Sequence, residues 1–114
     1  MDAHVKDNDK AVLVYATFPS LESAEKAATQ LIEAELVACV NILPAMISHY
    51  RWQGQLQREQ EAVVLAKTRA SRSSDVTKAI VAAHTYDVPA VVVFDTAGGN
   101  PAYLEWVMSE TRAG

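Results

Sequence analysis

The feature that most constrains the fold is one long extended stretch in the middle of the chain, interrupted only by Pro44 and Gly54. Val37–Leu43 and Ala45–Gln53 have the composition of a β-strand, and Pro44 marks a bend between them because proline cannot donate a ladder hydrogen bond. Gly54 supplies a turn, and Gln57–Thr68 returns as the next strand with the apolar run AVVLA near its end. The stretch therefore predicts a long antiparallel hairpin.

The register of this hairpin depends on the length of its loop. A three-residue loop at Gln53–Gln55 places Trp52 opposite Leu56. The same loop places His49 opposite Glu59, whereas a two-residue loop shifts every pair. The sequence leaves both possibilities open.

The segment before the hairpin combines a strand with a helix. Ala11–Phe18 is an apolar run rich in β-formers, and Pro19 ends it. Ser20 is a suitable N-cap for a helix that runs to about Glu35, with apolar residues three and four positions apart. These patterns predict a first strand followed by an amphipathic helix.

The segment after the hairpin repeats this alternation. Ser71 or Ser73 caps a second amphipathic helix, and Ala90–Thr96 has the composition of a fourth strand. Asn100 as N-cap and Pro101 at the first helical position predict a short final helix. The order βαββαβ plus a terminal helix, with right-handed crossovers, predicts an α+β fold: a ferredoxin-like antiparallel sheet that carries both main helices on one face.

The predicted hairpin is too long for the domain that carries it. The residues from Ala38 to Gln53 span roughly 50 Å at the usual rise of a strand, whereas a domain of this size is only about 34 Å across. The strands also lack apolar and polar alternation, which indicates cover on both faces. We therefore expect Tyr50, Trp52 and Leu56 to lie against a neighbouring subunit. The alternative is a twisted hairpin folded back over its own sheet.

Composition excludes several classes of protein. The chain has 114 residues, of which 50% are apolar, so we expect a single domain from residue 11 to 114 after a mobile polar tail of residues 1–10. The 10 Lys and Arg against 14 Asp and Glu, with no basic run, disfavour nucleic acid and anionic membranes as partners. Without an apolar leader or membrane span, and with Cys39 alone, the sequence predicts a soluble cytoplasmic protein.

Several segments together resemble one known family. ACVNILPAMISHYRWQGQL, VVLAKT, HTYDVPA and AYLEW are similar, in order and spacing, to signature segments of the CutA family of divalent-cation tolerance proteins. The resemblance extends from about Val12 to Val107. It implies a ferredoxin-like homotrimer in which sheets face inward and hairpins reach over neighbours, an assembly similar to that of the PII signalling proteins. It also implies a role in tolerance of copper and other divalent metals, with metal or a small ligand bound in clefts between subunits.

The chain departs from this family's usual pattern at four positions. Ala45 stands where glycine is usual, Thr85 where proline is usual, and Ala90 where an acidic residue is frequent. Ala16 replaces a cysteine that some relatives carry in the first strand. The missing carboxylate and thiol weaken a metal site inferred by analogy alone.

Four residues are candidate metal ligands. His84 precedes a loop with Tyr86 two residues on, and a neutral imidazole is a good ligand for Cu²⁺ or another divalent cation. Glu59 and Glu61 share one strand face and offer two oxygen ligands. Cys39 is a fourth candidate. The alternatives are a loop histidine satisfied within the chain, solvated or salt-bridged carboxylates, and a cysteine that packs as a small apolar group.

Six residues are candidates for binding a small ligand: Trp52, Lys67, His84, Tyr86, Tyr103 and Trp106. Lys67 ends an apolar strand and can neutralise a carboxylate or phosphate in an intersubunit cleft. Tyr103 and Trp106 are three apart on a predicted helix, where they either pack in the core or line a cleft. Solvation of Lys67 at the strand end is the alternative interpretation for that residue.

Motifs of enzymes are missing from the sequence. It contains no G-x-S-x-G, Walker A, H-E-x-x-H or C-x-x-C motif, so we expect a binding protein and not an enzyme. The first hypothesis is a trimer that binds divalent metal through His84 and Glu61. The alternatives are a PII-like sensor of an anionic metabolite or nucleotide, and a stable trimeric scaffold for a protein partner.

Overall fold

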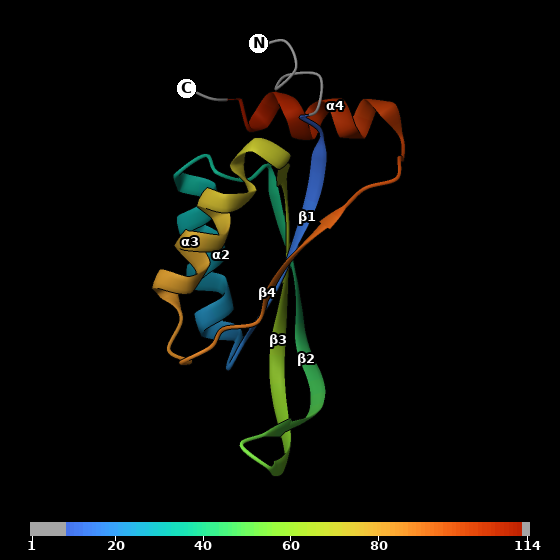
Figure 1. Cartoon of the computed structure of the whole chain (residues 1–114). Coiled ribbons are helices and arrows are strands. Elements are labelled where there is room, and N and C mark those ends of the chain that lie inside the picture. The colour runs from blue at the N-terminus through green and yellow to red at the C-terminus, as the bar shows by residue number, and fades with distance from the viewer. Residues whose placement is uncertain (1–8, 113–114) are drawn as a thin grey trace.

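The computed structural model describes residues 9–112 as an α+β fold with one sheet and helices packed beside it (Figure 1). The strands are β1 (Ala11–Phe18), β2 (Cys39–Trp52), β3 (Gln55–Arg69) and β4 (Val91–Asp95), and the helices are α2 (Leu21–Glu33), the 3₁₀ turn η1 (Ala70–Arg72), α3 (Ser73–Ala83) and α4 (Pro101–Glu110). The predicted βαββαβ order with a terminal helix is confirmed.

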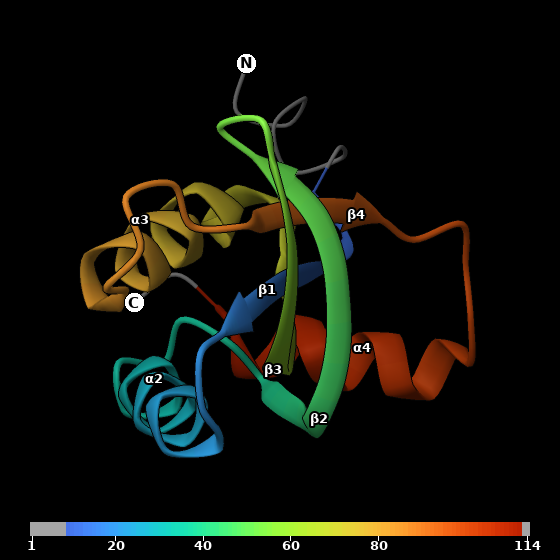
Figure 2. The same ribbon diagram turned by 90° about the horizontal axis from the view of Figure 1, so that it is seen from below.

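All strand pairs in the sheet are antiparallel, and the strand order is β2-β3-β1-β4. The two longest strands are therefore neighbours at one side, and the short β4 forms the opposite edge. Both views place α2 and α3 together on one side of the sheet (Figure 2). The ferredoxin-like topology with both main helices on one face is confirmed.

The core lies between this helical layer and the sheet. The side chains of Val14, Phe18 and Val64 on the sheet and of Leu31 and Ile80 on the helices are at most 2% exposed. Alternate residues of each strand point to this face, because successive side chains of a strand point to opposite sides. The core therefore uses only one face of the sheet.

Local capping fixes where α2 begins and ends. The Ser20 hydroxyl accepts a hydrogen bond from the Ser23 main-chain N–H, and the Ser23 hydroxyl accepts one from the Ser20 N–H, which forms a reciprocal capping box. Ser20 was the predicted N-cap. The helix ends at Glu33, two residues before the predicted end, because Glu35 adopts a left-handed conformation with φ 58°.

The hairpin has a two-residue loop, Gln53 and Gly54, with φ of 51° and 80°. Trp52 consequently pairs with Gln55, and His49 pairs with Arg58. The three-residue loop is not the one that forms. Positive φ at both loop residues matches the twist of the flanking strands, which selects the shorter turn.

The hairpin extends beyond the helices, as predicted from its length (Figure 1). The described chain measures 48 Å along its longest axis and 26 Å along each of the others. A register shift between Leu43 and Met46, around Pro44, bends β2 within the sheet. The strand thus remains continuous across the predicted bend.

Helix α4 lies across the end of the sheet that is farthest from the hairpin tip (Figure 1). Arg69 at the end of β3 donates to the Thr111 hydroxyl and to the Met108 carbonyl, which ties α4 to the sheet. Asp9 accepts a hydrogen bond of 3.0 Å from Arg69 and bonds to Ser71 as well. Of the predicted tail, residues 1–8 lie outside the described residues, and Asp9 is anchored to the sheet.

The sheet face opposite the helices carries exposed apolar side chains. Leu43, Val92 and Phe94 are each about half exposed there, beside Tyr15, which contacts Phe94 edge-on at 6.3 Å. Unpartnered apolar surface of this kind is typical of interaction faces. Within residues 9–112 no helix is long and apolar enough to cross a membrane.

Candidate functional site

The largest hollow in the described structure lies where the hairpin leaves the sheet. It has a volume of about 800 Å³ and is lined by Tyr15, Thr17, Met46, Ile47, Ser48, His49, Tyr50, Trp52, Glu59, Glu61, Tyr86, Asp87, Val88 and Ala90. We call it the hairpin pocket. Three segments supply its walls: β1, the two strands of the hairpin, and the loop between α3 and β4.

The strand period determines which hairpin side chains reach the pocket. Glu59 pairs with Ser48 and Glu61 with Met46, so these four residues share one face of the ribbon with Tyr50 and Trp52. The predicted shared face of Glu59 and Glu61 is confirmed. Arg51 and Arg58 have the opposite parity, and within residues 9–112 neither forms an ion pair with the two carboxylates.

Glu61 is the most buried charged group of the pocket, with 7% of its surface exposed. The Tyr86 hydroxyl donates a hydrogen bond of 3.1 Å to its Oε2 atom. The Oε1 atom has no hydrogen-bond partner among the described residues and is not sealed from solvent. One carboxylate oxygen is therefore held in place while the other is available to a ligand.

The pocket is electrostatically negative. Glu59, Glu61 and Asp87 line it, and none of its described lining residues is Lys or Arg. Burial and the hydrogen bond and charge of Glu61 raise the pKa of Tyr86 to about 12. Burial and the charges of Glu59 and Glu61 also raise the pKa of Tyr50. Both phenols thus stay protonated near neutral pH, and their rings and hydroxyls face a site that favours positive charge.

His84 lies beside the pocket but uses both ring nitrogens within the chain. Its Nε2 is 2.6 Å from the Thr17 carbonyl oxygen, and its Nδ1 accepts a bond from the Tyr86 main-chain N–H. The carbonyl can only accept, which assigns the proton to Nε2. The ring also stacks on Phe18 at 4.6 Å between centroids. His84 positions the Tyr86 loop, which is the alternative that sequence analysis left open.

The other predicted site residues gather near α4, far from the hairpin pocket. Cys39 pairs with Lys67, six residues along β3 from Glu61 and so about 20 Å away. The Lys67 ammonium lies 3.9 Å from the Cys39 sulfur, bonds to Asn41, and is 5.9 Å from the centre of the Tyr103 ring. Trp106 packs beside Tyr103 with ring centroids 5.7 Å apart. The predicted ligand set is therefore divided between two places.

The metal-ligand set is incomplete within one copy of the chain. Among residues 9–112, no three His, Cys, Asp or Glu side chains lie close enough together to hold a metal ion. Glu59 and Glu61 are neighbours, but Cys39 is distant and the nitrogens of His84 are occupied. One copy offers oxygen ligands but not a closed coordination shell.

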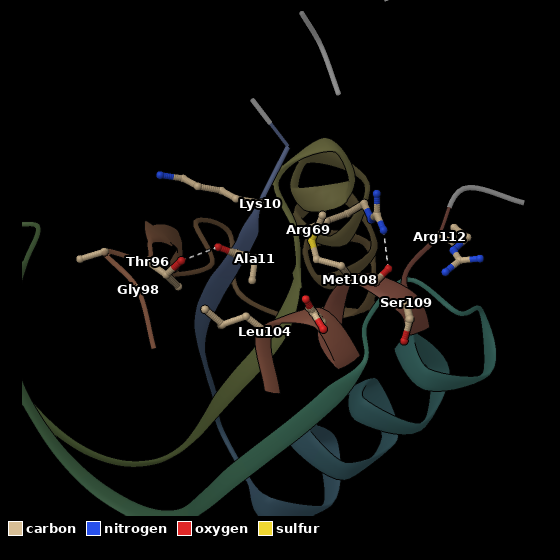
Figure 3. Close-up of a pocket in the computed structure, with 11 residues that line it drawn as sticks. Lys10, Ala11, Arg69, Thr96, Gly98, Leu104, Met108, Ser109 and Arg112 are labelled. Atoms are coloured by element: carbon tan, nitrogen blue, oxygen red, sulfur yellow. Dashed lines mark hydrogen bonds between the residues drawn. The ribbon is translucent and has the colours of Figure 1, made fainter. Parts of the chain in front are cut away.

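A second hollow of about 420 Å³ lies between β1 and α4 (Figure 3). Its central cation, Arg69, is already satisfied by Asp9, Thr111 and Met108. Lys10 and Arg112 lie on opposite sides of this hollow. The second hollow is thus a packing feature of the α4 contact, and it does not concentrate groups for binding.

The sequence predicts Trp52, Glu59, Glu61 and Tyr86 as site residues, but not the other polar and aromatic residues that line the pocket. Tyr50 was assigned to a subunit contact, although its period-2 spacing from Trp52 places both on the same face. Asp87 and Tyr15 carry no comparable signal. They reach the pocket because the loop that carries Asp87 and the strand that carries Tyr15 meet there in the fold. No periodic pattern in the sequence indicates such a contact.

Comparison with known proteins identifies the family. The family described as CutA1 divalent ion tolerance protein matches residues 12–110. The chain is 40% identical over 99 residues to the divalent-cation tolerance protein CutA of Thermus thermophilus, covering 87% of this chain and 96% of that protein. It is 39% identical over 102 residues to the chloroplastic protein CutA of Arabidopsis thaliana, covering 90% of this chain. The chain spans 56% and 58% of the lengths of the Arabidopsis and rice relatives.

Solved structures agree with the sequence comparison. The CutA1 structure from Oryza sativa has a TM-score of 0.87 at 39% identity and covers 92% of this chain and 96% of that one. The Cut A1 structure from Thermus thermophilus has a TM-score of 0.86 at 39% identity and covers 90% and 99%. The two Thermus thermophilus names describe divalent-cation tolerance, and none of these relatives has a name that states a reaction. The chain therefore belongs to the CutA1 divalent ion tolerance family.

Proposed function

We propose that this protein acts as a cytoplasmic homotrimer in the response to copper or other divalent cations, and that it binds the cation in the hairpin pocket. Binding, and not catalysis, is the proposed activity. The observation that carries the proposal is Glu61, a buried carboxylate with one oxygen fixed by Tyr86 and the other free in an acidic pocket.

The trimer is supported by two features of the sheet. Its open face carries the half-exposed side chains of Leu43, Val92 and Phe94, which need cover. Its hairpin extends beyond the body of the domain and presents Trp52 and Leu56 near the tip. A PII-like ring, in which sheets face inward and each hairpin reaches a neighbour, covers both features at once.

A divalent cation fits the pocket in part. Carboxylate oxygens of Glu59 and Glu61 are suitable ligands for a divalent cation. Because residues 9–112 of one copy lack a closed set, the remaining ligands come from a neighbouring copy or from water. Cation binding is coupled to assembly of the trimer where a neighbouring copy supplies a ligand.

An anionic metabolite is the alternative ligand, and it receives less support at this pocket. Glu59, Glu61 and Asp87 repel an anion, and the lysine proposed to neutralise it, Lys67, is distant. An anion-binding role therefore depends on Lys67 and Tyr103 at the other end of the sheet. A protein partner on the apolar face is the third possibility, and it competes with trimer formation.

Metal titration tests the proposal. We expect the metal-free wild-type protein to bind Cu²⁺ in calorimetry, and Glu61→Gln to reduce the affinity at least tenfold. Glu110→Gln, an acidic residue of α4 outside the pocket, is the matched control. Binding weaker than the millimolar range, or equal binding by wild type and Glu61→Gln, would reject the site. Light scattering on the same samples reports the oligomeric state independently.

A further inference from the structure

We propose that the hairpin pocket also binds an alkylated ammonium ion, that is, an organic cation with methyl or short alkyl groups on nitrogen. This ligand class goes beyond the divalent cation of the proposed function, although both ligands use the carboxylates of the same pocket. The inference rests on the charge of the pocket, its aromatic walls and its size.

The charge of the pocket selects a cation. Three carboxylates, of Glu59, Glu61 and Asp87, line the cavity, and none of its described lining residues is Lys or Arg. Glu61 supplies the anchoring charge because it is 7% exposed and its Oε1 atom has no hydrogen-bond partner in the described chain. A buried carboxylate needs a countercharge more than an exposed one, because water does not screen it.

The aromatic walls select an organic cation over a bare metal ion. Tyr15, Tyr50, Trp52 and Tyr86 line the pocket, and they come from β1, β2 and the loop before β4. The faces of tyrosine and tryptophan rings attract cations through the ring quadrupole, and quaternary ammonium ions are the ligands most often recognised in this way. A metal ion held by carboxylates contacts oxygen atoms, and it gains nothing from four rings.

The size of the pocket leads to the same ligand class. A cavity of about 800 Å³ is in the range of small-molecule sites and far exceeds the volume of one ion. Met46, Ile47 and Val88 add apolar surface beside the rings, and a thioether adapts to irregular ligands. The alkyl groups of an ammonium ion can pack against this apolar surface while its positive charge remains near Glu61.

The electrostatic state of the phenols supports this arrangement. Tyr86 and Tyr50 are protonated near neutral pH, because the ordinary pKa of tyrosine is 10.0, and burial and the nearby carboxylates raise both pKa values further. Neither ring therefore adds a negative charge that would favour a metal ion. The two side chains remain neutral aromatic surfaces, with Tyr86 fixed by its bond to Glu61.

Tetramethylammonium is the simplest probe. We expect the metal-free full-length protein, at constant ionic strength, to bind tetramethylammonium chloride saturably in calorimetry. tert-Butanol has similar bulk but no charge, and we expect it to bind at least tenfold more weakly. Glu61→Gln should lose tetramethylammonium binding as well as metal binding, because the anchoring charge disappears.

Two tryptophans provide a matched pair of variants. Trp52 and Trp106 are 44% and 42% exposed, but only Trp52 lines the hairpin pocket. We expect Trp52→Leu to weaken tetramethylammonium binding about fivefold, which corresponds to about 1 kcal/mol for a partly exposed cation–π contact. Trp106→Leu should leave it unchanged.

The outcomes separate this inference from the proposed function. No saturable binding of tetramethylammonium, equal binding of tert-butanol, or equal losses in Trp52→Leu and Trp106→Leu would overturn the inference. Failure of the Cu²⁺ titration with tetramethylammonium binding intact rejects the metal site alone. Circular dichroism and light scattering on each variant show that fold and assembly are unchanged, and Tyr50→Leu provides a second pocket variant if Trp52→Leu does not fold.

Discussion

The Tyr86 hydroxyl donates a 3.1 Å hydrogen bond to Glu61, which joins the loop after α3 to the middle of β3 across 25 residues of sequence. This contact fixes one wall of the hairpin pocket against another. It also places a phenol beside a buried carboxylate, which raises the pKa of Tyr86.

The first prediction concerns the ionisation of Tyr86. Its pKa in the folded chain is about 12, above the ordinary value of 10.0, because burial disfavours the phenolate and Glu61 bonds to and repels it. We expect Glu61→Gln to lower this pKa, although burial still keeps it above the ordinary value. Ultraviolet absorbance of tyrosinate measures the change, and Tyr103→Phe removes one tyrosine without touching the pair.

The raised pKa of Tyr86 also predicts how the free energy of unfolding changes at alkaline pH. A raised folded pKa contributes stability that is complete below pH 10 and is lost as pH rises from 10 to about 12. Tyr86→Phe has no such group, so its free energy of unfolding should decline less steeply over this range. If the free energy of unfolding of Tyr86→Phe declines as steeply between pH 10 and 12 as that of the wild type, the raised pKa of Tyr86 is contradicted.

The second prediction concerns the open sheet face. Phe94 is 49% exposed on that face, and a charge there opposes burial against a second copy. We expect Phe94→Asp to reduce the mass in light scattering at micromolar protein from three times 12.4 kDa to 12.4 kDa. Val81→Asp, at a 45% exposed position on α3, is the control and should stay trimeric. A trimer of Phe94→Asp would show that another surface holds the copies together.

The third prediction concerns the anchor at the start of the fold. Burial acts to raise the pKa of Asp9, but bonds from Ser71 and the bond and charge of Arg69 outweigh it and lower the pKa below 3.8. We expect Asp9→Asn to destabilise the protein by about 2 kcal/mol near neutral pH, because Arg69 loses a charged partner. Urea unfolding measures this loss.

The pH dependence of this destabilisation follows from the direction of the pKa shift of Asp9. A depressed folded pKa contributes stability above the ordinary pKa, and that stability disappears as pH falls below it. The difference between wild type and Asp9→Asn should therefore narrow below about pH 4. Asp95→Asn, whose exposed ion pair with Lys10 is 3.8 Å long, is the control and should have little effect at any pH. If the difference in free energy of unfolding between wild type and Asp9→Asn stays constant down to acid pH, the role of the Asp9 charge is contradicted.

The secondary structure was largely predictable because its signals are local. The run Ala11–Phe18 became β1 without change, and the caps at Ser20 and Asn100 begin α2 and α4 as expected. The length of the hairpin also predicted its overhang. The N-cap predicted for α3 was wrong: neither Ser71 nor Ser73 caps the helix, because the 3₁₀ turn that precedes it makes Arg72 the N-cap, without a side-chain hydrogen bond, and the helix starts at Ser73.

The candidate site was predictable only in part, because it depends on contacts between distant segments. Glu61, Trp52 and Tyr86 meet in one pocket, whereas Lys67 and Tyr103 lie at the other end of the sheet. Strand periodicity assigns a side chain to a face but not to a position along the sheet. The hydrogen bond of the His84 Nε2 atom likewise depends on a carbonyl 67 residues away, and no local sequence pattern indicates this contact.

The last prediction concerns the turn at the hairpin tip. Gly54 has φ of 80°, and a Cβ added there meets no atom within 4 Å, so the cost of Gly54→Ala is conformational and not steric packing. We expect Gly54→Ala to destabilise the protein by about 1 kcal/mol and Gln53→Asn, at φ 51°, to stabilise it, because asparagine tolerates the left-handed region. Gly99→Ala is the control, since its φ is not in that region and its Cβ meets Leu104 at an ordinary 3.6 Å. Equal effects of Gly54→Ala and Gly99→Ala in urea unfolding would contradict the role of the left-handed conformation at Gly54 in the two-residue turn.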